Sequence, residues 1–155
     1  MEKTSKCVDT ALLVEQYRTL LETVDVLPLQ VTGSSMTPFL APGRDSVLLR
    51  KPPERLRRGD IALYRRGSGT YVMHRVYRCE GGGTYSMLGD AQQQVEHGIR
   101  REQIIAVACA AQRKGKEQKP GRFWWEFFAR VWIRIVPLRP MLRGLYGRTF
   151  GRRRS

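Results

Sequence analysis

The stretch from residue 26 to residue 110 constrains the fold most, because it consists of short β-rich segments separated by turn residues. Six segments combine β-branched, aromatic and other apolar residues in short runs. They read VLPLQVTG, DSVLLRK, GDIALYRR, TYVMHRVYRC, GTYSMLGD and EQIIAVACAAQ. The segments APGR, RGSG and EGGG carry the glycine and proline of turns and loops. This spacing predicts a mainly β chain that folds as a small, twisted, partly closed β-sheet domain.

The length of 155 residues suits one domain with a substantial core and is too short for two domains of ordinary size. From Asp9 onward, apolar residues recur at spacings of three and four, which predicts an N-terminal amphipathic helix. They are Leu12, Leu13, Tyr17, Leu20, Leu21 and Val24. We therefore expect this helix within residues 1–28, the β domain at 29–112, a basic linker at 113–121 and a C-terminal segment at 122–155.

The C-terminal segment begins with RFWWEFFARVWIRIV, which is unusually aromatic. Its charged residues are spaced by four, so on a helix they form one narrow stripe among apolar positions. These residues are Arg122, Glu126, Arg130 and Arg134. The pattern predicts an amphipathic helix that lies on a membrane surface, has its arginines on anionic lipid and ends at Pro137. A C-terminal helix that buries its aromatic side chains against the β domain is the alternative.

Positive charge is concentrated near the C-terminus. The chain carries a net charge of +14, of which residues 111–155 contribute +11, residues 31–110 contribute +5 and residues 1–30 contribute −2. This distribution indicates an anionic partner for the C-terminal segment rather than for the whole fold. A nucleic-acid binder is a second class to consider. We do not expect nucleic acid as the partner, because no helix-turn-helix precedes the β-rich stretch and the N-terminal helix belongs to the acidic part.

The spacing of the cysteines and the pattern of the N-terminal residues indicate the cellular compartment of the protein. Cys7, Cys79 and Cys109 lie far apart and in no CxxC spacing, so no disulfide framework, metal site or cofactor is expected. The first apolar stretch is interrupted by polar residues, which excludes a secretory signal peptide and an N-terminal transmembrane helix. Together with the arginine excess, these features predict a cytoplasmic protein that is peripheral on the inner face of the membrane.

Candidate catalytic residues come from few positions. The stretch GSSMTPFL offers two adjacent hydroxyls, and a serine hydroxyl is inert until a positioned base takes its proton. His74 suits that task because imidazole titrates near neutrality, and the period of a strand places it on one face with Val72 and Val76. Asp90 and Glu96 follow as acids that could orient it. A core histidine that makes one hydrogen bond is the plainer alternative for His74.

Four boxes in order, GSSMTPFL, RRGDIALYRR, YVMHRVYR and YSMLGDAQQQVEHG, resemble the serine peptidases of the signal peptidase and LexA group. The resemblance covers residues 29–110. It implies that Ser35, which directly precedes Met36, is the nucleophile and that His74 is the general base. Histidine in that place is similar to the signal peptidases of the endoplasmic reticulum, of archaea and of some Gram-positive bacteria.

The same resemblance implies the remaining parts of the site. Glu96 occupies the position of the orienting acid, with Asp90 as the other candidate. Gly33 stands where the family often has a serine, so the oxyanion hole would rest on backbone N–H groups around Gly33, Ser34 and Met36. The implied activity is that of a serine endopeptidase that cleaves an extended leader or signal peptide, bound as an added strand. A catalytically inactive peptide-binding module of the same fold is the alternative.

Overall fold

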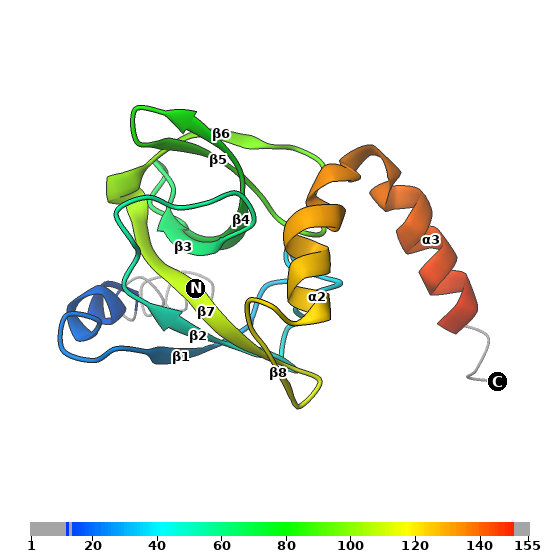
Figure 1. Ribbon diagram of the computed structural model, residues 1–155, viewed down its shortest axis with the longest axis horizontal. Coiled ribbons are helices and arrows are strands. Elements are labelled where there is room, and N and C mark those ends of the chain that lie inside the picture. The colour runs from blue at the N-terminus through cyan, green and yellow to red at the C-terminus, as the bar shows by residue number, and fades with distance from the viewer. Residues whose placement is uncertain (1–11, 13, 151–155) are drawn as a thin grey trace, which may run out of the picture.

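The structure is a computed structural model that describes residue 12 and residues 14–150, and within this part the chain is mainly β, as predicted (Figure 1). Its strands are β1 (Leu27–Gln30), β2 (Ser46–Arg50), β3 (Ile61–Arg65), β4 (Tyr71–Gly81), β5 (Thr84–Leu88), β6 (Glu96–Arg100), β7 (Ile104–Arg113) and β8 (Lys116–Gln118). They form one antiparallel, partly open sheet in the order β1-β2-β7-β3-β4-β5-β6, and β8 pairs with β7.

Each of the six predicted segments contains a strand, and two further strands were not anticipated. β6 reads EHGIR, a sequence that lacks the alternation of apolar and polar residues typical of a strand. Its Gly98 also has a positive φ of 72°. β8 reads KEQ and lies inside the range expected as a linker. Lys114 and Gly115, both with positive φ, form the tight turn that brings β8 back onto β7. Both strands owe their existence to pairing with a neighbour.

The two faces of the sheet bury two separate apolar clusters. Residues opposite each other in antiparallel strands share a face, so the pair Ala62 and His74 lies on one side and the pair Leu63 and Met73 on the other. The first face packs a cluster of Leu56, Ala62, Tyr64, Val76, Tyr85, Met87, Ile99, Ile104 and Val107. The second face packs the larger cluster, to which Met36 contributes. His74 therefore lies on a buried face, as its strand alternation predicts.

The N-terminal helix is described at residues 14–20, and the predicted positions 9–11 and Leu13 lie outside the described residues. Its contact with the sheet is narrower than the apolar pattern predicts. Val14 and Leu21 join the larger cluster and Tyr17 packs against it, whereas Leu12, Leu20 and Val24 are exposed. The helix ends at residue 20, which leaves Val24 in the following turn and out of register with the buried face.

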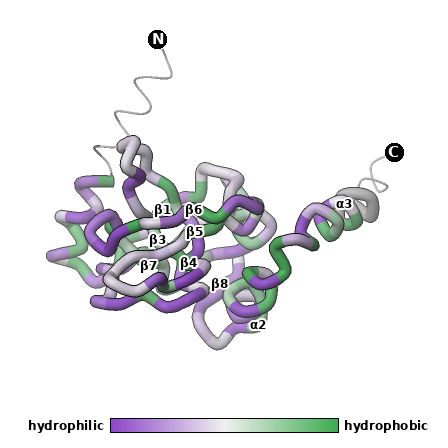
Figure 2. The backbone as a smooth tube through the Cα atoms, turned by 90° about the horizontal axis from the view of Figure 1, so that it is seen from above, coloured by the Kyte–Doolittle hydropathy of each residue, from purple (hydrophilic) through white to green (hydrophobic). Residues whose placement is uncertain are grey.

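The C-terminal segment is helical but not one continuous helix. α2 (Phe123–Glu126) continues into the helical turns η2 (Phe127–Val131) and η3 (Trp132–Arg134), and η4 (Val136–Leu138) leads into α3 (Arg139–Phe150). The direction changes at Ile135, just before Pro137, and α3 projects away from the sheet (Figures 1 and 2). Within the described part of the chain, no helix is both long and apolar enough to cross a membrane.

One side of α2, η2 and η3 is buried against the sheet, which matches the packed alternative for this segment. Trp125, Phe128 and Trp132 belong to the larger cluster, and the rings of Phe39 and Phe128 have centroids 4.9 Å apart. Gly59 permits the approach, since a Cβ there would lie 2.9 Å from the Ala129 carbonyl oxygen. The helix is therefore attached to the domain by its aromatic side chains.

Candidate active site

Ser35 lies in the turn between β1 and β2, which is anchored by its neighbours. Met36 is 1% exposed and inserts into the larger cluster, while Ser34 and Gly33 are exposed and Ser35 is partly buried. The Thr37 backbone N–H and hydroxyl both donate to the Ser34 carbonyl, at 3.1 and 2.7 Å. The apolar side chain of Met36 thus fixes a turn in which Ser34 is exposed and Ser35 is partly buried.

The backbone donors of this turn are available for a ligand. Among the described residues, the N–H groups of Ser34, Ser35 and Met36 donate no hydrogen bond, and the Ser35 hydroxyl has no partner. A Cβ at Gly33 would meet nothing within 4 Å, so the space in front of the turn is open on that side. The turn therefore contains backbone N–H groups that have no partner among the described residues.

His74 on β4 is held by one ring nitrogen. Its Nδ1 is 3.1 Å from the Tyr64 hydroxyl oxygen, and Tyr64 donates its proton to Glu96 Oε2 at 3.0 Å. Because a carboxylate only accepts and Tyr64 has one proton to give, the Tyr64 oxygen must accept from His74 Nδ1–H. The hydrogen bonds therefore assign the tautomer of His74 that carries its lone pair on Nε2.

The second ring nitrogen of His74 has no hydrogen-bond partner among the described residues. No fully buried side-chain nitrogen or oxygen there lacks a partner, so Nε2 keeps a small solvent contact although His74 is only 2% exposed. An unoccupied lone pair on an oriented ring is what a general base requires.

Burial favours the neutral form of His74. The pKa of His74 is lowered from 6.5 to about 4, mainly by burial and then by the Arg66 guanidinium, while Glu96 and Asp90 act in the opposite direction. Burial and the neighbouring Glu96 raise the pKa of Tyr64, so its hydroxyl remains protonated. At neutral pH the histidine is therefore uncharged and ready to accept a proton.

The two candidate acids have different partners. Glu96 is bound by Arg66, whose Nη2 lies 2.9 Å from Oε2, and it reaches His74 through Tyr64 rather than directly. Asp90 forms a two-point ion pair with Arg75, at 2.9 and 2.8 Å, and both side chains are fully buried. Asp90 thus serves Arg75 on the opposite face of β4, and Glu96 alone is linked to the His74 ring.

Ser35 and His74 are connected by the loop that follows β5. Ala91 N–H donates to the Ser35 carbonyl at 2.9 Å, and Asp90 binds Arg75, the neighbour of His74 in β4. Gly89 completes the contact, since a Cβ there would lie 2.6 Å from the Ser35 carbonyl oxygen. The structure gives no hydrogen bond between Ser35 and His74 themselves, so the loop at 89–91 sets their relation.

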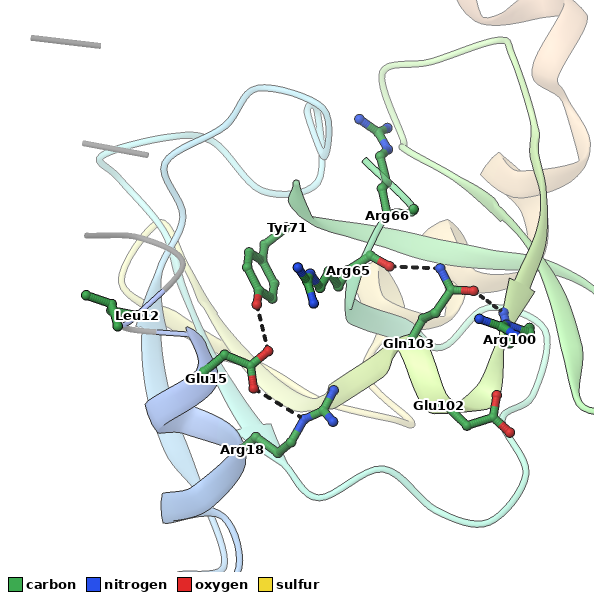
Figure 3. A pocket seen from close by; sticks show the side chains of 10 residues that line it. Leu12, Glu15, Arg18, Arg65, Arg66, Tyr71, Arg100, Glu102 and Gln103 are labelled. Carbon is green, nitrogen blue, oxygen red and sulfur yellow. Dashed lines mark hydrogen bonds and ion pairs between the residues drawn. The ribbon is translucent and has the colours of Figure 1, made fainter. Parts of the chain in front are cut away.

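A cavity of about 800 Å³ lies beside this network (Figure 3). Its walls carry four arginines, two glutamates and other side chains from the N-terminal helix, β3, β4, β6 and the turn after β6. They are Leu12, Glu15, Arg18, Arg65, Arg66, Gly67, Tyr71, Arg100, Glu102 and Gln103. The Tyr71 hydroxyl donates to Glu15 at 2.6 Å, and Gln103 donates to the Arg65 carbonyl at 2.9 Å. Arg66 joins the cavity to Glu96.

Sequence reasoning missed two side chains of the network, Tyr64 and Arg66. Both lie in the segment GDIALYRR, which is predicted as a strand and forms part of one of the four boxes, without a role assigned to either side chain. In the described residues, His, Cys, Asp and Glu side chains do not gather in threes as a metal site would require. The chain matches no protein-family model and no curated protein. The contacts of its own residues are therefore the basis for inferring its chemistry.

Proposed function

We propose that the protein is a serine endopeptidase that resembles signal peptidases and cleaves an extended leader or signal peptide. The observation that carries the proposal is the chain from Glu96 through Tyr64 to His74 Nδ1, which leaves the lone pair on Nε2. A core histidine that makes one hydrogen bond would show the same contact, so the proposal also rests on the order of the four sequence boxes. The order of the four sequence boxes supplies the nucleophile, Ser35, whose turn is linked to β4 through the loop at 89–91.

The proposed mechanism is acyl transfer. Ser35 Oγ attacks the peptide carbonyl carbon, and His74 Nε2 takes the hydroxyl proton. The C–N bond then breaks, and His74 returns the proton to the leaving amine. Water attacks the resulting ester, with His74 taking its proton and passing it back to Ser35 Oγ. The imidazolium that forms in each step is stabilised by the charges of Glu96 and Asp90.

The oxyanion would be bound by backbone N–H groups. The backbone N–H groups of Ser34, Ser35 and Met36 support this, since they donate no hydrogen bond to the described residues. Where the effect has been measured in enzymes, removal of one oxyanion-hole donor lowers the rate by about 10²–10³-fold. Gly33 leaves the approach to them open.

The substrate would bind as an added strand. In the described sheet, β1 pairs with β2 alone, so its second edge has no partner strand. Pro28 has no N–H, and its carbonyl accepts the Tyr17 hydroxyl at 2.6 Å, so an extended peptide would pair with the part of the edge between Pro28 and the Ser35 turn. We further propose that the sheet corresponds to the signal peptidase and LexA-like fold, since the four boxes fall on the Ser35 turn, β3, β4 and the segment from β5 to β6.

A catalytically inactive peptide-binding module is the alternative. Its support is the absence of a hydrogen bond between Ser35 and His74 in the described structure, and the indirect route from Glu96 to the ring. Such a module would keep the β1 edge and bind peptide without turnover.

The test combines a serine-directed covalent probe with cleavage of a library of extended peptides. Ser35→Ala and His74→Ala should each lower the rate by on the order of 10⁴-fold if the two groups act as one unit. Ser34→Ala is the matched control, because its hydroxyl is exposed one residue away. An equal loss in Ser34→Ala would refute the choice of nucleophile. Peptide binding without cleavage by the wild type would establish the inactive module.

We also propose that the protein is peripheral on the inner face of an anionic membrane, through the C-terminal segment at 122–155, whose described part has an exposed side. Phe123 is 71% exposed and Met141 is 60% exposed, and further apolar side chains of this segment face the solvent. They are Trp124, Val131, Leu138 and Leu145. Between residues 122 and 155 there are nine arginines and one glutamate, a composition that suits lipid phosphates.

Vesicle binding tests this location. The protein should sediment with vesicles that contain anionic lipid and remain free with zwitterionic ones, with binding weakened by salt. Met141→Asp should reduce binding, whereas Leu20→Asp, at an exposed apolar position outside the segment, should not. Binding to nucleic acid in preference to anionic vesicles would overturn the proposal. The exposed aliphatic side chains are buried by a lipid surface but not by a phosphate backbone, so the proposal requires vesicles to bind better.

A further inference from the structure

We propose that Arg139 is a positioning residue of the active site, which holds the loop at 89–92 and through it the turn that carries Ser35. The inference rests on the proposed function for its catalytic consequence. Arg139 is the first residue of α3 and is 1% exposed, whereas the other arginines of this segment whose exposure is described, Arg122, Arg130, Arg134 and Arg143, are exposed.

The guanidinium of Arg139 binds carbonyl oxygens only. Nη1 donates to Gly89 at 3.0 Å and to Gln92 at 2.8 Å, while Nε and Nη2 donate to Trp132 at 3.3 and 3.0 Å. The Arg139 Cζ atom also lies 5.5 Å from the Trp132 ring centroid. The planar fork of arginine reaches these directions together, which the single ammonium of lysine does not.

Two neighbours hold the same loop. The Trp132 ring nitrogen donates to the Asp90 carbonyl at 2.8 Å, and Arg143 donates to the Ala91 carbonyl at 3.0 Å. Every carbonyl from Gly89 to Gln92 therefore accepts a hydrogen bond from the C-terminal segment. Such convergence on four consecutive residues fixes a loop that has no partner strand of its own.

The loop transmits this restraint to Ser35. The Ala91 N–H bond to the Ser35 carbonyl and the absence of room for a Cβ at Gly89 mean that the loop and the turn move as one unit. The same loop contains Asp90, whose carboxylate binds Arg75 beside His74. A displaced loop would thus shift the nucleophile relative to the base, and small displacements at reacting atoms cost large factors in rate.

Burial of an unpaired cation argues for a specific role. Burial lowers the pKa of Arg139, opposed by the nearby charge of Asp90. Arg139 forms no ion pair with a described carboxylate, so carbonyl oxygens replace its hydration. Apolar residues could attach α3 to the domain at a lower desolvation cost. The N–H groups of the Arg139 guanidinium, by contrast, fix the directions of the Gly89 and Gln92 carbonyl groups.

The test compares Arg139→Gln and Arg139→Lys with Arg134→Gln, which changes an exposed arginine five residues before Arg139. Hydrogen exchange at the Ala91 amide should accelerate at least tenfold in Arg139→Gln and remain unchanged in Arg134→Gln. This readout needs no enzymatic activity, so it separates failure of the clamp from failure of the proposed function. For peptide cleavage, Arg139→Gln should lower kcat by about tenfold to a hundredfold, on the scale of misplaced groups, with KM within about twofold.

Partial rescue distinguishes positioning from bulk stability. Arg139→Lys should recover part of kcat without restoring the wild-type exchange rate, because it retains the charge and loses the fork. Assays run far below the unfolding midpoint keep each variant folded. Unchanged Ala91 exchange in Arg139→Gln would overturn the clamp. A kcat loss matched by Arg134→Gln, or exchange that accelerates equally throughout the sheet, would also overturn it.

Discussion

The depressed pKa of His74 makes the stability of the fold depend on pH in a way that a single substitution can isolate. An unfolded histidine titrates near 6.5, whereas the folded pKa of His74 is about 4. Between these values the unfolded chain binds more protons, so the free energy of unfolding rises with pH. The stability due to neutral His74 is complete above about pH 6.5 and is lost as the pH falls toward 4.

The size of the effect follows from the two pKa values. Between pH 7.5 and pH 4.5, His74 alone should remove about 2.5 kcal/mol from the free energy of unfolding. Other groups titrate in this range as well, so the change is measured as a difference between proteins. His74→Asn retains a polar group near the Nδ1 position and cannot be protonated, and His97→Asn changes an exposed histidine as the control.

Urea unfolding followed by tryptophan fluorescence at both pH values provides the assay. The wild type and His97→Asn should lose about 2.5 kcal/mol more than His74→Asn on acidification. A cavity left by the substitution lowers stability equally at both pH values and cancels. If all three proteins lose the same free energy within about 0.5 kcal/mol, the smallest difference such extrapolations resolve, His74 is not held neutral by burial and the reasoning is refuted.

Four further predictions follow from the site. If His74 is the base, kcat/KM should fall only below about pH 5, since the resting pKa is about 4, and an acid limb near pH 6.5 would contradict this. Tyr64→Phe and Glu96→Gln should each lower kcat by on the order of 10²-fold, with the double variant no worse, because they act through one hydrogen-bonded chain. Asp90→Asn should lower the free energy of unfolding by about 3–5 kcal/mol in urea, whereas Arg75→Met with Asp90→Leu should recover most of it. Gly89→Ala should cost about 1–3 kcal/mol through contact with the Ser35 carbonyl, while Gly67→Ala, where a Cβ meets nothing, should be neutral or stabilising by thermal unfolding.

The positions of most strands were predictable, because the local composition of β1 to β5 and β7 and the turn residues around them indicate strands. β6 and β8 were not, since EHGIR and KEQ become strands only when β5 and β7 provide partners. The N-terminal helix shows the same limit. Its apolar residues predict a face, but the sheet covers only the part formed by Val14, Tyr17 and Leu21.

The candidate site divides in a similar way. Residue type and position make His74, Asp90 and Glu96 candidates, and the resemblance of the four boxes to signal peptidases favours Ser35 over Ser34. The partners of the two acids could not be chosen in this way, because Tyr64 is separated from Glu96 by 32 residues and Arg75 from Asp90 by 15. Strand register and the bulges between β4, β5 and β6 determine which donors face each carboxylate.

By itself the sequence determined a mainly β chain, the face of β4 on which His74 lies and the concentration of arginine near the C-terminus. These are properties of local spacing and charge, which persist in any compact arrangement of the chain. Only the tertiary structure decided that Tyr64 links Glu96 to His74 and that Arg139 reaches the carbonyl of Gly89, 50 residues away. A buried donor binds whichever acceptor the packing brings within about 3 Å, and that choice depends on long-range contacts that no local pattern encodes.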